Sequence, residues 1–118
     1  TSATARSGGG NPTMALYGAS KAALNRITDG LARELADTGV RVNGVEPRAA
    51  VLTEGAAALV GDSLTDDLIE SLEAMTEAVV ALCDCPPELT GRVCVSLDLI
   101  EELGLTVFDL DGTTPATG

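Results

Sequence analysis

Residues 17–47 read YGASKAALNRITDGLARELADTGVRVNGVEP, and the order of elements in this stretch decides the fold. Side chains recur at spacings of three and four on one face: Tyr17, Lys21, Leu24, Thr28, Leu31 and Leu35. This stripe predicts a helix over about 14–38, anchored by its leucines. Gly39 is typical of a left-handed C-terminal cap, and the Val-x-Val alternation after it predicts a strand over 40–46, stopped by Pro47. Helix, glycine and strand together form the second half of a crossover in an α/β fold.

The rest of the chain continues this alternation. The expected elements are a loop over 6–13, a short helix over 53–61, a break at 61–63, a helix over 66–83, a strand over 92–97 and a helical turn over 99–103. Two parallel strands do not make an independently stable sheet, because such sheets are covered by helices on both faces and have more strands. We therefore expect part of a larger sheet domain, with the missing part N-terminal.

Composition narrows the classes of function. Six of the seven basic residues lie within the first 50, whereas fourteen of the eighteen acidic residues follow, and a strongly acidic second half repels a phosphate backbone. We therefore expect no nucleic-acid partner. The chain lacks histidine, the commonest general base and metal ligand. It also has no apolar run of roughly 18 residues, so no membrane-spanning helix is expected.

The three cysteines are an odd number, which favours a reducing, cytoplasmic environment over a disulfide framework. A tetrahedral metal site needs four ligands, and Cys83, Cys85 and Cys94 supply three. We interpret them as small apolar side chains and expect no metal site.

Tyr17 and Lys21 are four residues apart, so their side chains can converge from one helix face. A free tyrosine titrates near 10, and acid/base chemistry at neutral pH requires the tyrosinate to be stabilised by roughly 4 kcal/mol. A lysine ammonium about 4 Å away in a partly screened site supplies a contribution of about that size. The pair therefore permits a cation-stabilised tyrosinate.

YGASKAAL (17–24) followed by GVRVNGVEP (39–47) resembles the short-chain dehydrogenase/reductase family, whose signature is Tyr-x-x-x-Lys at the start of a long helix and then an Arg-Val-Asn-x-Val-x-Pro strand. The match is close over 13–53 and looser to about residue 98. The resemblance implies an α/β fold, the C-terminal part of a Rossmann-like doubly wound parallel sheet over 1–98, with 99–118 as a tail. It also implies part of an NAD(P)-dependent oxidoreductase that transfers hydride between a nicotinamide and a carbonyl or alcohol.

The resemblance assigns the catalytic roles. Tyr17 would exchange a proton with the substrate oxygen, and Lys21 would bind the nicotinamide ribose and stabilise the tyrosinate. The substrate-orienting serine of the family corresponds best to Ser2, although its separation from Tyr17 is slightly long. Thr4 and Ser7 are the alternatives.

The cofactor-binding residues implied by the resemblance are Tyr17, Lys21, Pro47, Val51 and Thr53. Val51 would present backbone groups to the nicotinamide amide, and Thr53 its hydroxyl to the cofactor. Arg48 stands where the family usually has glycine, so the geometry of this loop can differ, and its charge could equally help to hold a phosphate.

Three features of the family are absent from residues 1–118: the glycine-rich phosphate-binding turn, the residue that selects NAD or NADP, and an asparagine on the preceding helix. We therefore expect the full-length parent to use NAD or NADP, and these residues alone to bind neither. The expected partners are a small carbonyl or alcohol and a second copy of the chain, through the helix over 17–38.

Two rival hypotheses remain. The first is a non-catalytic remnant or dimerisation module of the same fold. The second rests on VFDLDGT (107–113), which is similar to the first motif of haloacid-dehalogenase-type phosphatases, with Asp109 as nucleophile and Asp111 as acid/base. The chain supplies only five residues after this motif, so an acidic turn after an apolar segment is the simpler interpretation.

Overall fold

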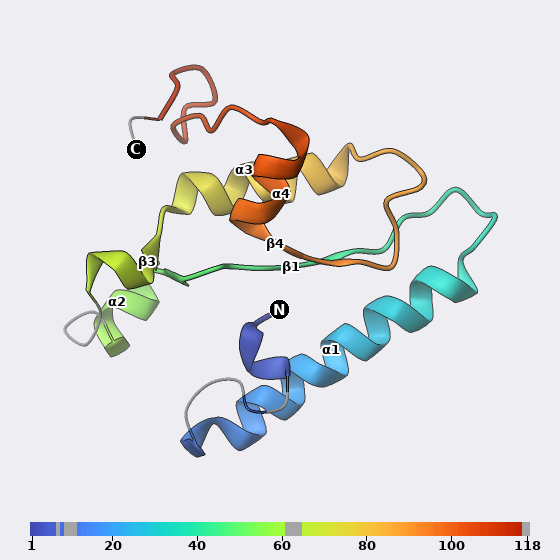
Figure 1. Ribbon diagram of the computed structural model, residues 1–118, viewed down its shortest axis with the longest axis horizontal. Coiled ribbons are helices and arrows are strands. Elements are labelled where there is room, and N and C mark those ends of the chain that lie inside the picture. Colours follow the sequence, from blue (N-terminus) through green and yellow to red (C-terminus); the bar gives the residue numbers. More distant parts are fainter. Residues whose placement is uncertain (7, 9–11, 61–64, 117–118) are drawn as a thin grey trace. The chain divides into compact units, whose positions relative to one another are not determined.

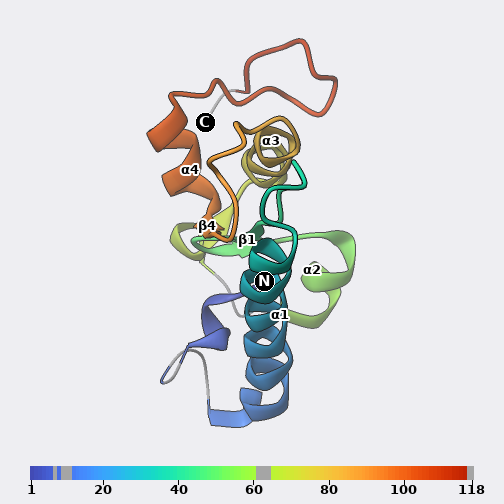
Figure 2. The same cartoon turned by 90° about the vertical axis from the view of Figure 1, so that its right-hand side faces the viewer.

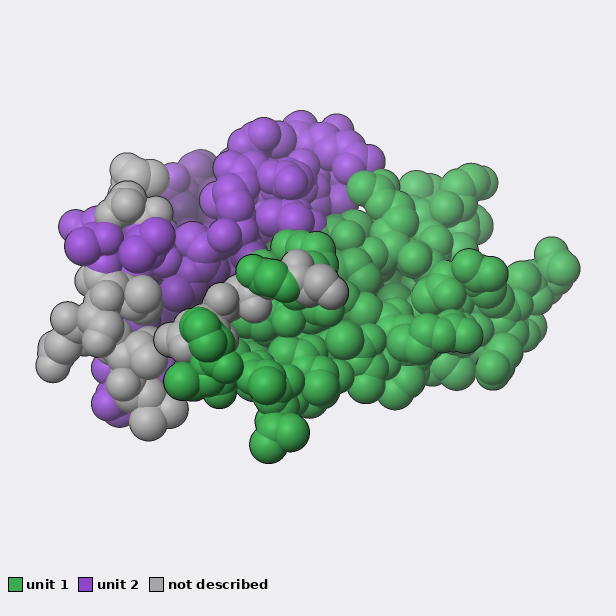
Figure 3. Space-filling model, turned by 60° about the horizontal axis from the view of Figure 1, so that its bottom comes forward, with its two compact units in different colours: residues 1–46, 84–94 green, residues 47–83, 95–118 purple. Residues whose placement is uncertain are grey.

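The computed structural model describes residues 1–6, 8, 12–60 and 65–116. The chain divides into two compact units, coloured separately in Figure 3. Unit 1 comprises Thr1–Glu46 and Asp84–Cys94, and unit 2 comprises Pro47–Cys83 and Val95–Gly118. Among the described residues, no helix is both long and apolar enough to cross a membrane.

Unit 1 is built around one long helix. Its elements are the 3-10 turns η1 (Ala3–Ala5) and η2 (Pro12–Met14), the helix α1 (Ala15–Glu34) and the strand β1 (Gly44–Glu46). Figures 1 and 2 both show η1 lying beside α1, with which it is in contact. The expected helix and strand are thus present, and both are shorter than predicted.

The buried face of α1 is made of small residues, Thr28 and Ala32. A Cβ added to Gly44 would lie 3.8 Å from the Thr28 hydroxyl oxygen, and one added to Gly91 would lie 3.3 Å from the Ala32 Cβ. The backbone therefore approaches this face too closely for leucine. Leu24 is 43% exposed and Leu31 is 40% exposed, so the prediction that the leucines anchor the helix is wrong.

The predicted end of the helix near Thr38 is also wrong, because α1 ends at Glu34 and Leu35 is its cap. The Thr38 hydroxyl donates to the Leu35 carbonyl (2.6 Å) and accepts from the Val40 N–H (3.2 Å), which closes a turn. Asp37 already has a left-handed φ of 67°, two residues before Gly39. A left-handed residue cannot continue a right-handed helix, so the chain leaves the helix early.

β1 pairs with β4 (Val93–Val95), and Figure 1 shows the two side by side. The Gly91 N–H donates to the Val42 carbonyl and the Gly44 N–H to the Arg92 carbonyl, both at 2.8 Å. The residue numbers rise on both strands from the first bond to the second, so the two strands run parallel. The predicted strands over 40–46 and 92–97 are therefore real but reduced to three residues each.

Just before β1, the Asn43 side chain makes the hydrogen bonds that backbone groups make between paired strands. Its amide nitrogen donates to the Leu89 carbonyl (2.7 Å), and its oxygen accepts from the Arg92 N–H (3.1 Å). Nearby, the Val42 N–H donates to the Thr90 hydroxyl (3.0 Å). Because side chains satisfy these backbone groups, residues 42–43 lie beside their partner without forming regular strand.

The described residues of unit 2 form a second pair of parallel strands and three α-helices. Its elements are β2 (Ala50–Val51), α2 (Glu54–Val60), the 3-10 turn η4 (Asp66–Leu68), β3 (Ile69–Glu70), α3 (Leu72–Cys83) and α4 (Ser96–Leu103). Ala50 pairs with Ile69 and Val51 with Glu70, in parallel. The helices α3 and α4 pack against each other. The short helix predicted over 53–61 is present as α2 over Glu54–Val60, and the predicted break at 61–63 falls outside the described residues.

Two predicted boundaries in this unit are wrong. The helix predicted from Asp66 begins only at Leu72, because residues 69–70 pair with β2 and the Ser71 hydroxyl caps α3 by accepting the Ala74 N–H (3.1 Å). The strand predicted to Leu97 gives way at Ser96 to α4, which ends at Leu103 and is capped by Gly104 with a left-handed φ of 62°. The helical period of 66–83 hid β3, because a strand of two residues is too short to show an alternation of its own.

Ser71→Ala removes the N-cap of α3. We expect a loss of about 1 kcal/mol in the free energy of unfolding, the usual cost of deleting such a cap, and Ser71→Asp should retain most of the stability because a carboxylate also caps. Urea unfolding followed by circular dichroism measures both. Equal destabilisation by Ala and Asp would show that the cap is not the stabilising feature.

Candidate active site

The Tyr17 and Lys21 side chains meet on the first turns of α1. The Lys21 ammonium lies over the Tyr17 ring, 5.3 Å from its centroid, which is within the range of a cation–π contact. Tyr17 is 46% exposed, so its side chain is accessible to a ligand.

Ser2 caps the turn η1. Its hydroxyl oxygen accepts from the Thr4 N–H (3.3 Å) and from the Thr4 hydroxyl (2.9 Å). The turn lies tightly on α1, since a Cβ on Gly18 would come within 2.6 Å of the Thr4 carbonyl oxygen. Gly18 follows Tyr17 directly, so this contact places the turn that carries Ser2 against the turn of helix that carries Tyr17.

The segment before η1 is fastened to both neighbouring elements of unit 1. The Thr1 nitrogen donates to the Val45 carbonyl (2.5 Å), and the Thr1 hydroxyl donates to the Lys21 carbonyl (3.5 Å). These bonds connect the start of the segment to β1 and to α1. The predicted residues Ser2, Tyr17 and Lys21 therefore come from one connected region.

The other end of the segment is held by an ion pair. The Arg6 guanidinium contacts the Glu46 carboxylate at 2.6 Å. Glu46 ends β1 and is 1% exposed, and its second oxygen has no hydrogen-bond partner among the described residues. A buried carboxylate needs such a partner, so Arg6 is tied firmly to the end of the strand. Ser7, an alternative to Ser2, lies outside the described residues, and Thr4 is the partner of Ser2.

The predicted cofactor-binding residues Pro47, Val51 and Thr53 all lie in unit 2. The Thr53 N–H donates to the Val51 carbonyl (3.0 Å), and the Thr53 hydroxyl accepts from the Ala56 N–H (3.3 Å) at the start of α2. The Thr53 hydroxyl proton remains available to a ligand, and Thr53 is exposed. The segment thus offers one hydroxyl donor at the end of a short strand.

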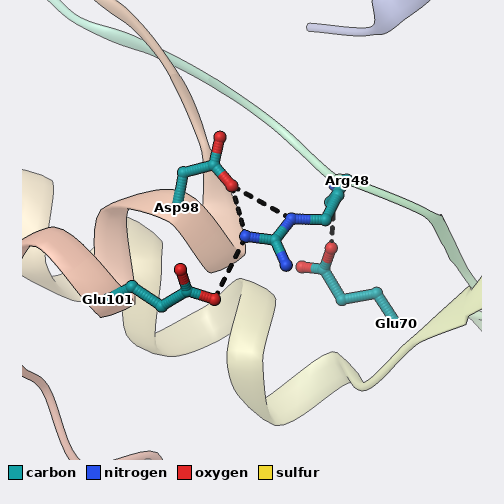
Figure 4. Close-up of polar contacts among 4 residues, drawn as sticks. All are labelled: Arg48, Glu70, Asp98 and Glu101. Atoms are coloured by element: carbon teal, nitrogen blue, oxygen red, sulfur yellow. Dashed lines mark hydrogen bonds and ion pairs between the residues drawn. The ribbon is translucent and has the colours of Figure 1, made fainter.

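Arg48 begins the same segment and is held by three carboxylates, shown in Figure 4. Its guanidinium pairs with Asp98 and, at 3.2 Å, with Glu101, both on α4. Its backbone N–H donates to the Glu70 carboxylate (2.9 Å), which is 4% exposed. The bonds from Asp98 first and Glu101 second hold the pKa of Arg48 above its usual value. Two carboxylates of α4 therefore compensate the charge of Arg48.

The DLDGT segment forms a local turn. The Asp111 carboxylate accepts from the Thr113 N–H (2.7 Å), the Thr114 N–H (2.9 Å) and the Thr114 hydroxyl (2.9 Å). The Asp109 N–H donates to the Thr114 carbonyl (2.7 Å), which closes the turn. Within the described ranges, no three Cys, Asp or Glu side chains gather as a metal would require. The contacts support the interpretation of an acidic turn.

Each unit offers hydrogen-bond donors of the kind that a dinucleotide accepts. In unit 1, the Lys21 side chain carries an ammonium, and Tyr17 beside it is 46% exposed. In unit 2, the exposed Thr53 offers a hydroxyl hydrogen. Residues 1–118 contain no G-x-G-x-x-G turn to receive a pyrophosphate.

The sequence does not predict several contacts of this region. It offers Thr4 only as an alternative to Ser2, and no local pattern indicates that Arg6 pairs with Glu46 or Arg48 with Asp98. The two ion pairs join residues 40 and 50 positions apart. Such distant pairs leave no local pattern in a single sequence. A buried acid at the end of a predicted strand is the one available signal, because it requires a partner.

Three comparisons relate the chain to known proteins. The family model described as short chain dehydrogenase matches residues 2–64. An uncharacterized oxidoreductase of Staphylococcus saprophyticus is 62% identical over 32 residues, which cover 27% of this chain and 14% of that protein. A crystal structure of a short chain dehydrogenase from Mycobacterium thermoresistibile aligns with a TM-score of 0.61 at 28% identity, over 89% of this chain and 35% of that one. The chain thus spans about a third of the latter.

The hydrogen bonds from Thr113, Thr114 and the Thr114 hydroxyl lower the pKa of Asp111 from its ordinary 3.8 to about 2. The pKa of Asp111 is lower in the folded chain than in the unfolded one, so the ionised carboxylate stabilises the turn. This stabilisation is complete at pH values above 3.8 and is lost as the pH falls through about 2. An NMR pH titration of the side-chain carboxyl measures this directly. Thr114→Val should move the Asp111 pKa only part of the way back to its ordinary value, since the two backbone N–H donors remain. An ordinary Asp111 pKa in the parent protein would show that these hydrogen bonds do not form.

Proposed function

The chain belongs to the short-chain dehydrogenase family, and we propose from this premise that it carries the acid/base half of an oxidoreductase active site. The reaction is reversible hydride transfer between a nicotinamide and a small carbonyl or alcohol. The observation that carries the proposal is the Lys21 ammonium over the Tyr17 ring, on the helix turn against which the Ser2 segment packs.

Each of the three side chains has a definite task. When the dinucleotide is bound, it supplies or accepts the hydride. The Tyr17 hydroxyl gives its proton to the carbonyl oxygen during reduction and takes it back during oxidation. The Lys21 charge stabilises the tyrosinate and donates to the ribose hydroxyls. Ser2 donates to the same substrate oxygen and orients it.

In unit 2, the segment over 47–53 is proposed to bind the nicotinamide end of the cofactor. Val51 backbone groups bind the nicotinamide amide, and the Thr53 hydroxyl donates to the cofactor. Pro47 sets the start of this segment, because its ring fixes φ where the chain leaves the strand. Arg48 acts through its contacts with α4 and Glu70 and not on the phosphates. NAD or NADP serves as the cofactor.

A second copy of the chain is the proposed protein partner. Leu24, Ile27 and Leu31 lie three and four residues apart on α1 and are 43%, 55% and 40% exposed. This exposed stripe also supports the alternative function, a non-catalytic dimerisation module. Loss of turnover in a Tyr17 variant separates the alternatives, since a dimerisation module has no turnover to lose. No disulfide joins Cys83, Cys85 or Cys94, which supports a cytoplasmic location.

The direct test uses the full-length product of the gene that encodes this chain. Tyr17→Phe removes only the hydroxyl, so turnover of a panel of aldehydes, ketones and diketones should fall about 10²- to 10⁴-fold while dinucleotide affinity stays within about twofold. Absorbance of the reduced nicotinamide follows turnover, and its fluorescence follows binding.

Arg26→Gln is the matched control on the same helix, because Arg26 is exposed and its side chain pairs with Asp29 alone in the described contacts. This variant should keep parental turnover. A Tyr17→Phe protein as active as the Arg26→Gln protein would refute the role of Tyr17.

Residues 1–118 on their own should not bind the cofactor tightly, because no glycine-rich turn receives the pyrophosphate. Titration of the 118-residue polypeptide with NADH and NADPH should show no saturable fluorescence change at micromolar concentrations of either. A saturable change at such concentrations would show that the phosphates find a site within these residues.

A further inference from the structure

The hydrogen bonds to Ser2 leave its hydroxyl able only to donate a further hydrogen bond. A serine hydroxyl has two acceptor lone pairs and one donor hydrogen. In this structure the oxygen accepts twice, from the Thr4 N–H at 3.3 Å and from the Thr4 hydroxyl at 2.9 Å. Both acceptor positions are therefore filled, and only the hydrogen of Ser2 remains for a third group.

A substrate carbonyl oxygen needs such a partner. A carbonyl oxygen carries no hydrogen and can only accept a hydrogen bond. Because the acceptor positions of Ser2 are both occupied by Thr4, its hydroxyl can offer the carbonyl oxygen only a donor. Without the Thr4 hydroxyl, the Ser2 hydroxyl could rotate and offer an oxygen instead. Thr4 therefore determines which way the Ser2 hydrogen points.

Thr4 is itself held firmly against α1. Its carbonyl oxygen lies so near Gly18 that a Cβ there would come within 2.6 Å. The bonds of Thr1 to Lys21 and Val45 fasten the residues just before it. Thr4 is half-buried, and its hydroxyl donates to Ser2. The contact between Thr4 and α1 therefore fixes the position of the hydroxyl that orients Ser2.

We propose that Thr4 is a positioning residue whose hydroxyl fixes Ser2 as a hydrogen-bond donor to the substrate oxygen. The inference rests on the proposed function, in which Ser2 orients the carbonyl or alcohol. It gives Thr4 a role in catalysis that acts through Ser2 and requires no contact between Thr4 and the substrate.

The test uses the full-length gene product, with a carbonyl from the panel that it reduces. Thr4→Val keeps the shape and removes the hydroxyl, and Thr4→Ser keeps the hydroxyl. Thr4→Val should lower kcat about tenfold, as expected for one neutral hydrogen bond, with dinucleotide affinity unchanged. Thr4→Ser should stay within about twofold of the parent. Thr76→Val, which removes a hydroxyl bonded to the Leu72 carbonyl on α3, is the matched control and should keep parental kcat.

A double-mutant cycle separates positioning from a merely structural role. Ser2→Ala should lower single-turnover rates about 10²- to 10³-fold, as for loss of one donor to the reacting oxygen. Adding Thr4→Val to Ser2→Ala should then cost nothing further. In a crystal structure of the Thr4→Val protein without substrate, the Ser2 side chain should occupy more than one rotamer.

Three results would overturn the inference while leaving the proposed function intact. They are parental kcat in Thr4→Val, equal losses in Thr4→Ser and Thr4→Val, and an undiminished loss from Thr4→Val when Ser2→Ala is present. Parental turnover in Ser2→Ala has a different meaning. It would show that Ser2 has no role in the reaction, so both the proposed role of Ser2 and the inference about Thr4 would fail.

Discussion

The close contact between the Thr4 carbonyl and Gly18 is the constraint on which the candidate active site depends. A side chain at position 18 would come within 2.6 Å of a backbone oxygen, so the turn carrying Ser2 can reach α1 only because glycine stands there. The same helix turn presents Tyr17, and the next presents Lys21. One helix and the tight turn against it thus carry a phenol, an ammonium and a serine hydroxyl.

Each compact unit buries one carboxylate at the end of a strand, and each carboxylate secures the segment next to it. In unit 1, Glu46 pairs with Arg6, which follows the Ser2 turn. In unit 2, Glu70 accepts the backbone N–H of Arg48, which opens the Pro47–Thr53 segment. A buried charge that loses its partner costs several kcal/mol, so these pairings are hard to break. Each unit therefore fixes one end of a segment that carries proposed site residues.

The sequence was sufficient for the parts of the fold that follow from local spacing. Tyr17 and Lys21 four apart on a helix, Gly39 in a turn and a strand before Pro47 are all present in the structure. The errors arose where distant residues decide the outcome. Leu24 and Leu31 stay exposed because Gly44 and Gly91 bring backbone against Thr28 and Ala32. No periodicity within α1 records that approach.

The candidate site was predictable to a similar degree. A family signature pointed to the tyrosine, lysine and serine, but the partners that position them come from contacts between residues far apart or from hydroxyl geometry. Arg48 illustrates the difference: its charge suggested a phosphate ligand, and only the structure places Asp98 and Glu101 around it. Residue type indicates what a side chain can do, and its neighbours determine what remains available.

A crystal structure of the full-length gene product with a nicotinamide dinucleotide and an unreactive substrate analogue would test the central claim most directly. The account predicts that Tyr17 and Ser2 both lie within hydrogen-bond distance of one oxygen of the analogue, with the Lys21 ammonium at the ribose hydroxyls. An analogue oxygen bound by other residues, with Tyr17 and Ser2 facing away from it, would contradict the account.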